Sequence, residues 1–372
     1  MKRLLYAFFA LLFNLSRAIF PLKRGRVAFV SMHNEGLHDS LGAVMEEVKA
    51  RGYETVLLTR RDLENVRTHP LHTLRFFFVG AHKLATAEAV YLNDNFMPMG
   101  SLRFRREVAV IQLWHAEGVF KKFGLSMPQP PEVRAREIAG NRKLSLVVCS
   151  SKAVAPYYAE AFGVSEAQVR PLGAPRADRL LRPGAREQAQ KALFAAFPAL
   201  AGKRLVLYAP TFRDADGENA ALLKKIDPAA FRTRFGEDAA LLVRLHPQIH
   251  PADRALEGAA DVTDFDDVPA LVLACDALIT DYSSICMDFA LLEKTCVFFA
   301  FDLERYKASR DFYFDYASYV PGPVVTTFAD ALDALSRPAD TEKLQTFRAF
   351  NFDYFDCESA RRAADLLEKA GS

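Results

Sequence analysis

The amino-acid sequence predicts an α/β protein with two Rossmann-like, doubly wound domains that face each other across a cleft. Short β-rich runs alternate with helical stretches from residue 26 onward, and such alternation is typical of parallel sheets with helical crossovers. A second alternating series begins at residue 205, after a polar segment at 184–202. The 372 residues suffice for two cores of ordinary domain size.

The first series contains five short apolar runs that we interpret as strands. They cover residues 27–31, 55–59, 89–93, 108–113 and 144–150. Between them, residues 41–51 and 76–87 are interpreted as helices.

The second series repeats this pattern. Its expected strands cover residues 205–209, 241–245, 277–280, 297–301 and 324–326. The resulting division is an N-terminal segment at 1–25, a first Rossmann-like domain at 26–183, a second at 184–340, and C-terminal helices at 341–372 that can cross back to the first domain. We interpret the polar segment 184–202 as the passage between the domains.

Composition limits the possible functions. The chain is 51% hydrophobic and 25% charged, and 48 basic and 46 acidic residues leave a formal net charge of +2. This balance gives no general basic field for nucleic acid, so any anion site must be local. The five cysteines are widely spaced and form no Cys-x-x-Cys pair, which predicts buried free thiols in a reducing compartment and neither a zinc nor a disulfide framework.

The N-terminal segment has an apolar core at residues 4–15 with basic residues on both sides. This core is shorter than the roughly 20 residues that cross a bilayer, and no Ala-x-Ala-like cleavage site follows it. Two interpretations remain: a helix lying in the membrane interface, with its basic flanks toward anionic headgroups, and a helix packed on the protein's own core. We favour the membrane interface.

A strand-to-helix turn near residue 281 is a candidate anion site. The apolar run 277–280 ends at Asp281, and an amphipathic stretch follows Ser283 and Ser284. Exposed backbone N–H groups and two hydroxyls at such a turn suit a phosphate. The alternative is an ordinary helix N-cap. The loop at 301–316 contains many polar and aromatic side chains, which indicates a functional role beyond connecting two elements.

Two histidines stand directly after apolar strands. His115 follows residues 108–113, with Trp114 beside it, and His246 follows residues 241–245. Carboxyl ends of parallel strands are where open α/β sheets bind ligands, although a lone histidine at such a position is often structural. Pro247 prevents His246 and His250 from lying on one helix as a metal pair, and no metal site is expected.

Several short motifs follow one another along the chain. They are Gln112-Leu-Trp-His115, Lys121-Lys122-Phe-Gly124, Gly173-Ala-Pro-Arg-Ala-Asp178, Tyr208-Ala-Pro-Thr-Phe-Arg-Asp214, Arg244-Leu-His-Pro247, Leu278-Ile-Thr-Asp-Tyr-Ser-Ser284, Asp302-Leu-Glu304, Arg310-Asp-Phe-Tyr313 and Pro321-Gly-Pro323. Taken in order, these motifs resemble the CDP-glycerol glycerophosphotransferases, the teichoic-acid primases and polymerases. The motifs cover more than half the chain. Ala116 replaces the family's glycine after the histidine, Asp311 replaces its glycine after the arginine, and the stretch from His115 to Lys121 is one residue longer.

The resemblance implies a GT-B fold and a transferase. The enzyme would move glycerol phosphate, or a related polyol phosphate, from a CDP-activated donor to a hydroxyl of a lipid-linked saccharide or cell-surface polymer, with release of CMP. It would need no cofactor, only CDP-glycerol or a similar CDP-polyol as substrate. It would work as a peripheral protein on the cytoplasmic face of the cell membrane.

The resemblance also assigns roles to residues. His115 is the expected general base and His246 the expected donor to the phosphoryl oxygens or leaving group. The expected donor-binding residues are Arg213, Arg244, Thr280, Asp281, Ser283, Ser284, Asp302, Glu304 and Arg310. On the acceptor side we expect Trp114, Lys121 and Lys122. For Asp302 and Glu304 a surface salt bridge is an equal alternative to a bond with ribose or glycerol hydroxyls.

Two other functions remain open from the sequence. One is a sugar-nucleotide glycosyltransferase with the same fold. The other is a degenerate family member that only binds a nucleotide or partner proteins at the membrane.

Overall fold

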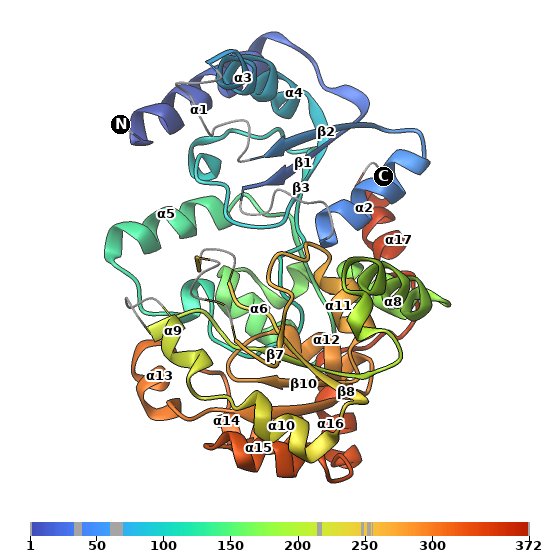
Figure 1. Cartoon of the computed structure of the whole chain (residues 1–372). Coiled ribbons are helices and arrows are strands. Elements are labelled where there is room, and N and C mark those ends of the chain that lie inside the picture. The colour runs from blue at the N-terminus through green and yellow to red at the C-terminus, as the bar shows by residue number, and fades with distance from the viewer. Residues whose placement is uncertain are drawn as a thin grey trace. The chain divides into compact units, whose positions relative to one another are not determined.

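The computed structural model of the chain describes residues 2–32, 39–59, 70–213, 218–246, 249–250, 254 and 256–370 (Figure 1). The chain forms two compact units. Unit 1 contains Met1–Asp178 and Phe352–Ser372, and unit 2 contains Arg179–Asn351. Each unit has its own parallel six-stranded sheet, so the prediction of two Rossmann-like domains is confirmed.

The sheet of unit 1 has the strand order β2-β1-β3-β4-β5-β6. Its strands are β1 (Lys23–Ser31), β2 (Glu54–Thr59), β3 (Ala87–Leu92), β4 (Ala109–Gln112), β5 (Leu146–Cys149) and β6 (Val169–Pro171). Because β1 pairs in parallel with both β2 and β3, the chain changes direction across the sheet between β1 and β3. Open α/β sheets bind their ligands at such a switch point.

Helices and short turns connect these strands. They are α1 (Lys2–Ile19), α2 (Ser40–Ala50), α3 (Pro70–Arg75), a π-helical turn η2 (Phe76–Gly80), α4 (Ala81–Ala85), η3 (Met99–Ser101), η4 (Gly124–Ser126), α5 (Pro131–Asn141), α6 (Ala155–Phe162), η5 (Glu166–Gln168) and η6 (Pro175–Ala177). The expected helix at 76–87 is therefore a π-helical turn followed by the short α4, and β3 begins two residues earlier than expected.

The C-terminal helices α17 (Ser359–Ala364) and α18 (Leu366–Ala370) belong to unit 1. The carboxylate of Asp178 accepts hydrogen bonds from the backbone N–H groups of Ser359 and Ala360, at 3.0 and 2.7 Å, and so satisfies the start of α17. The hydroxyl of Tyr91 in β3 donates to the carbonyl of Ala363 at 2.8 Å. These bonds fix the C-terminus to the sheet.

Unit 2 has the strand order β12-β11-β10-β7-β8-β9. Its strands are β7 (Arg204–Ala209), β8 (Ala239–Val243), β9 (Ala260–Asp261), β10 (Ala277–Thr280), β11 (Thr295–Phe299) and β12 (Val324–Val325). In Figure 1, β10, β7 and β8 run side by side. The switch point lies between β7 and β10, because β8 and β10 are the neighbours of β7 on its two sides.

The helices and turns of unit 2 include the segment that was expected to be an interdomain passage. They are α7 (Asp178–Leu181), α8 (Ala185–Ala196), η7 (Pro198–Leu200), α9 (Glu218–Leu223), α10 (Pro228–Phe235), α11 (Val268–Ala274), α12 (Ile285–Leu291), α13 (Leu303–Ser309), α14 (Tyr316–Tyr319), α15 (Phe328–Leu335) and α16 (Thr341–Asn351). The expectation for 184–202 is corrected, because α8 packs against α11 within unit 2. The units divide after Asp178 and after Asn351.

Helix α1 packs on the core of unit 1 with one side, as the second interpretation of the N-terminal segment expects. Phe9 and Phe13 are each 1% exposed, and the helix packs against α4 and η2. The hydroxyl of Ser16 lies 2.8 Å from Nδ1 of His82 in α4. The opposite face, including Leu4 and Leu11, is exposed. One side of α1 therefore packs on unit 1, and the other side makes no contact with the core that the structure describes.

Candidate functional site

The switch point of unit 2 brings together the loops that follow β7 and β10. Asp281 is the first residue after β10, and its Oδ1 accepts the backbone N–H groups of Thr211, at 2.7 Å, and Tyr282, at 2.5 Å. Thr211 lies two residues beyond the end of β7. One carboxylate oxygen therefore holds both loops at the point where the fold favours ligand binding.

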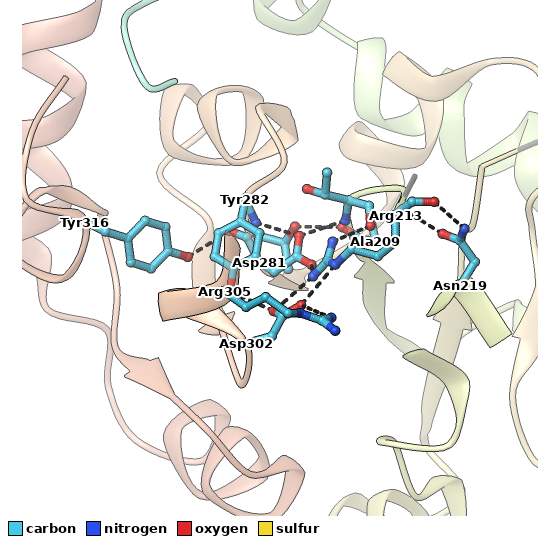
Figure 2. Close-up of polar contacts among 10 residues, drawn as sticks. Ala209, Arg213, Asn219, Asp281, Tyr282, Asp302, Arg305 and Tyr316 are labelled. Atoms are coloured by element: carbon cyan, nitrogen blue, oxygen red, sulfur yellow. Dashed lines mark hydrogen bonds and ion pairs between the residues drawn. The ribbon is translucent and has the colours of Figure 1, made fainter. Parts of the chain in front are cut away.

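A buried ion cluster lies beside this junction (Figure 2). Arg213 donates through Nη2 to Asp281 at 2.7 Å, and through Nε and Nη2 to Asp302 at 3.1 Å each. The three side chains are only 5%, 3% and 9% exposed. Burial opposes the charge of Arg213, but the two carboxylates outweigh burial and raise its pKa. Burial likewise opposes ionisation of Asp302, yet the bonds from Arg213 and Tyr282 lower its pKa.

Three tyrosines contact the cluster, and Figure 2 shows two of them, Tyr282 and Tyr316. Tyr282 stacks on Tyr306 with a centroid distance of 3.8 Å, and its hydroxyl donates to Asp302 at 2.8 Å. The guanidinium carbon of Arg213 lies 5.2 and 5.5 Å from these two ring centroids, within cation–π range. The hydroxyl of Tyr316 donates to the carbonyl of Asp281 at 2.8 Å. The loop after β11 and helix α14 are thus joined to the same junction.

These bonds change the interpretation of three expected donor-binding residues. Arg213, Asp281 and Asp302 bind one another, so their direct role is to hold the loops after β7, β10 and β11 together. Thr280 is also committed: it is 0% exposed and its hydroxyl donates to the carbonyl of Ala209 at 2.6 Å. The side chains of all four residues are largely buried and bind other groups of unit 2.

The serine turn, Ser283 and Ser284, follows Asp281 and Tyr282 directly in the chain. Ser284 is the N-cap residue of α12, but its side chain makes no capping hydrogen bond. Ser283 Oγ accepts from the N–H of Ile285 at a long 3.5 Å. Ser284 is exposed, and its hydroxyl has no partner within the part of the chain that the structure describes. The ordinary N-cap interpretation does not explain these two hydroxyls.

Arg244 and His246 follow β8 on the other side of β7. Arg244 Nη1 donates to the carbonyls of Phe265, Thr263 and Val262 at 2.8, 3.1 and 3.2 Å. One end of the guanidinium is therefore fixed, and no described residue pairs with Nε or Nη2. Burial lowers the pKa of Arg244 despite nearby carboxylates.

The ring of His246 packs on Phe212, with the centroids 4.7 Å apart. Phe212 belongs to the loop after β7, so this contact brings the end of β8 to the switch-point loop. Burial and the charge of Arg244 lower the pKa of His246. The imidazole is consequently neutral at neutral pH, a state that accepts a proton on one nitrogen and donates from the other.

In unit 1, the end of β4 presents Trp114 and His115. Trp114 adopts a left-handed backbone conformation with φ of 61°, which is rare for a bulky residue and marks a strained position. Its N–H donates to Gln112 Oε1 at 3.0 Å, and its ring stacks on Phe123 with centroids 5.1 Å apart. The exposed His115 lies beyond it, its ring 4.1 Å from that of Trp114.

The backbone also orients His115. Its Nδ1 lies 3.4 Å from the carbonyl of Asn93, a contact that requires the proton on Nδ1 because a carbonyl only accepts. Nε2 is then the basic nitrogen, as a general base needs. Lys121 and Lys122, both half-buried, follow on the same loop.

Two expected donor-binding residues lie on the surface. The side chain of Glu304 is 88% exposed and pairs with Lys307 at 3.3 Å, which is the surface salt bridge considered as an alternative. Arg310 is exposed just after α13. The described residues contain no group of three histidine, cysteine or acidic side chains that could hold a metal ion.

Comparison with known proteins identifies the family. The model of the CDP-glycerol:poly(glycerophosphate) glycerophosphotransferases matches residues 11–369. This chain belongs to that family.

Named relatives of this glycerophosphotransferase-family protein act in teichoic acid synthesis. A teichoic acid ribitol-phosphate primase of Bacillus spizizenii is 28% identical over 99% of this chain and 97% of the relative. The ribitol-phosphate polymerase TarL of Staphylococcus aureus is 35% identical over 75% of this chain, but the match spans about half, 51%, of that longer protein. The similarity to TarL therefore does not show that this chain polymerises ribitol phosphate.

Solved structures show the family's fold. The wall teichoic acid polymerase TagF superposes with a TM-score of 0.77 at 22% identity, over 96% of this chain and 93% of that chain. The UDP-GlcNAc 2-epimerase of Neisseria meningitidis superposes with a TM-score of 0.56 at 11% identity, over 92% of this chain and 100% of that chain. The GT-B fold expected for this glycerophosphotransferase-family protein is confirmed.

Proposed function

We infer that the protein is a transferase that moves a polyol phosphate from a CDP-activated donor to a hydroxyl acceptor in cell-wall polymer synthesis. The observation that carries this inference is the family match over residues 11–369. It is supported by two histidines that each follow a strand of a separate Rossmann-like unit, β4 for His115 and β8 for His246. The relatives' names support glycerol phosphate and ribitol phosphate as the groups transferred.

The proposed step is an attack by the acceptor oxygen on the phosphorus that carries the polyol. A new P–O bond forms to the acceptor, the P–O bond to CMP breaks, and the acceptor proton passes to a base. No electrons leave or enter the system. The site must therefore take up one proton and stabilise charge on the transferred phosphoryl group and on CMP.

We assign these tasks to residues of both units. Nε2 of His115 takes the acceptor proton, since the contact with Asn93 keeps the proton of the ring on Nδ1. The neutral His246 donates its N–H to a phosphoryl oxygen or to the leaving group. The N–H groups of Arg244 that do not bind carbonyls donate to the same oxygens. Ser283 and Ser284 donate to the pyrophosphate. Arg213, Asp281 and Asp302 keep these groups in place.

A donor-specificity assay tests this function. The purified protein is given CDP-glycerol, CDP-ribitol and UDP-N-acetylglucosamine, each with a lipid-linked disaccharide acceptor, and nucleotide release is followed by chromatography. Acceptor-dependent release of CMP is the expected result. Release of UDP with transfer of the sugar would instead establish a glycosyltransferase, and tight CDP binding without release of CMP would establish a degenerate, binding-only protein.

We also propose that α1 and the segment 70–80 attach the protein to the cytoplasmic face of the cell membrane. The described residues contain no helix that is both long and apolar enough to span a bilayer. Large apolar side chains are nevertheless exposed on both elements: Leu4, Leu11 and Ile19 at 76%, 62% and 62%, and Leu71 and Leu74 at 77% and 58%. Phe8 joins the two elements, with centroids 5.5 Å from Phe77 and 6.1 Å from Phe78.

Vesicle binding tests the membrane proposal without disturbing the core. Leu11→Glu changes an exposed residue and should release the protein from anionic vesicles, because it places a charge in the apolar interface. Leu57→Glu is the matched control, since Leu57 is an exposed leucine of β2 in the same unit, at 36%. Equal binding by wild type and Leu11→Glu would reject this surface.

A further inference from the structure

Unit 1 contains a pocket beside the carboxyl ends of β3 and β4 that the proposed step does not yet use. The loop after β3, the turn η3 and the helix α5 form its walls, and it encloses a cavity of about 80 Å³. A buried water needs about 10–15 Å³ of such space, so the pocket has room for a group of several heavy atoms.

Close packing fixes two of the walls. A Cβ added to Gly100 in η3 would lie 3.0 Å from the Cβ of Ala139 in α5, so α5 would have to give way by a few tenths of an ångström. Glycine allows this approach because it has no Cβ. The turn η3 and the helix α5 are therefore closely packed where they form the walls of the pocket.

Hydrogen bonds connect the pocket to the candidate base. Gln112, at the end of β4, lines the pocket, and its Oε1 accepts the N–H of Trp114 at 3.0 Å. Its Nε2 lies 3.4 Å from the carbonyl of Asp94. His115 follows Trp114, and its ring contacts the carbonyl of Asn93. A ligand in the pocket would thus lie next to the backbone that orients His115.

The lining suits a polyhydroxyl group that carries a phosphate. Phe96 and Met99 supply apolar surface for C–H groups, and Asn95 and Asn141 supply amides for hydroxyls. Asn141 is 6% exposed, and its Nδ2 has no hydrogen-bond partner among the described residues. Burying an amide N–H without a partner is costly, so a bound hydroxyl would satisfy a donor that is already in place.

The charged lining residues are Arg136, Glu137 and Asp94, and the carboxylate of Asp94 accepts the N–H of Met32 at 3.1 Å. Arg136 on α5 lines the pocket and is exposed, and no described residue pairs with its guanidinium. The carboxylate of Glu137 in the same wall already accepts from Gln129 at 2.7 Å. A guanidinium at the rim binds a phosphate through paired, charge-assisted hydrogen bonds.

We propose that this pocket is the acceptor site, which holds a polyol-phosphate unit of the acceptor chain and presents its terminal hydroxyl to His115. The proposal rests on the function inferred above and adds the part of the substrate that unit 1 recognises. Arg136 binds the acceptor phosphate, and the amides bind its hydroxyls.

Steady-state kinetics of Arg136→Gln test the proposal, with a synthetic glycerol phosphate trimer as the acceptor. Loss of one charge-assisted contact should raise the acceptor KM about tenfold or more. The KM for CDP-glycerol and the slow hydrolysis of CDP-glycerol without acceptor should stay unchanged. With glycerol as an uncharged acceptor, the difference from wild type should disappear.

Arg134→Gln is the matched control. Arg134 is an exposed arginine on the same helix that donates to the carbonyl of Leu125 at 2.8 Å and does not line the pocket. Arg134→Gln removes the same charge as Arg136→Gln, so a general electrostatic effect would change the acceptor KM of both variants. Equal acceptor KM values for Arg136→Gln and Arg134→Gln would overturn the proposal.

Direct binding separates this proposal from the proposed function. Calorimetry with the glycerol phosphate trimer requires no turnover, and we expect weaker binding to Arg136→Gln than to Arg134→Gln or wild type. If wild type releases no CMP from any CDP-polyol but shows this binding pattern, the transferase function fails and the pocket stands. If CMP is released and the trimer binds all three proteins equally, the pocket fails alone.

Discussion

Asp281→Asn tests the ion cluster beneath the candidate donor site. The substitution keeps the shape of the side chain and an Oδ1 that can still accept from Thr211 and Tyr282. It replaces the Oδ2 that accepts from Arg213 at 2.7 Å by an amide N–H₂ group. Two donors then face each other in a place where the carboxylate was 3% exposed and the guanidinium 5%.

The magnitude follows from this burial. Removing one partner of a buried ion pair costs about 3–5 kcal/mol, because the other charge stays buried without compensation. Arg213 keeps its bonds to Asp302, so we take the lower end, about 3 kcal/mol. In a domain of this size each kcal/mol lowers Tm by about 2–4 °C, which gives a fall of about 6–12 °C.

Thermal unfolding followed by circular dichroism measures this shift, and hydrogen exchange assigns it to unit 2. Asp276→Asn is the matched control at the other end of β10. Asp276 also accepts a backbone N–H from β7, that of Leu205 at 2.8 Å, and pairs with Arg186, but its side chain is 30% exposed. An exposed pair contributes no more than about 1 kcal/mol. Equal shifts for the two variants would refute the view that the cluster organises the site.

Three further predictions concern other parts of the account. Replacing Ser283 and Ser284 by Ala should weaken CDP-glycerol binding in calorimetry about tenfold or more, and unchanged affinity in a folded variant would exclude this turn. Burial, with the charges of Arg26 and Lys83, lowers the pKa of His82 below its ordinary value of 6.5. The neutral ring therefore stabilises unit 1 above pH 6.5, and this contribution is lost as the pH falls through the lowered pKa. The free energy of unfolding of His82→Gln should lack this loss at acid pH, and identical pH profiles of the variant and wild type would contradict the argument. Changing His115 or His246 to Ala should lower kcat by about 10² to 10⁴-fold, and the double variant should lose less than the product, whereas multiplicative losses would place the two in separate steps.

The strands were predictable where the sequence contains uninterrupted apolar runs between turn residues. Residues 27–31 and 205–209 read as strands and lie within β1 and β7. The short β6 (Val169–Pro171) and β9 (Ala260–Asp261) were not predicted. Each has too few residues to show a period, and each exists because a neighbouring strand offers a free edge. Tertiary pairing decides such elements.

The site was predictable in place and only partly in detail. Asp281 and His115 were identified because each follows an apolar strand, and the carboxyl ends of parallel strands lie at the same edge of a sheet. The sequence could not show that Arg213 lies 68 residues from Asp281 in the chain and 2.7 Å from it in space. A polar residue at a strand end reads the same whether it binds a ligand or another side chain. Tyr282, Tyr306 and Tyr316 were missed as a framework, although the aromatic loop at 301–316 was a signal for Tyr306 and Tyr316.

Helix α1 shows a similar limit. Apolar residues occupy most positions from 4 to 15, so the sequence did not show which of them face the core and which are exposed. The structure separates them: Phe9 is 1% exposed and Leu4 is 76% exposed. Which phenylalanines pack on η2 depends on the sequence near residue 77, far from α1 in the chain.

An isotope experiment tests the central claim of polyol-phosphate transfer most directly. The acceptor hydroxyl is labelled with a heavy oxygen isotope, and the products formed from CDP-glycerol are analysed by phosphorus NMR and mass spectrometry. We predict that the label bridges the acceptor and the glycerol phosphate in a new phosphodiester, and that the CMP released carries none. Label attached to the phosphorus of CMP, or a product that contains no glycerol phosphate, would contradict the proposed reaction.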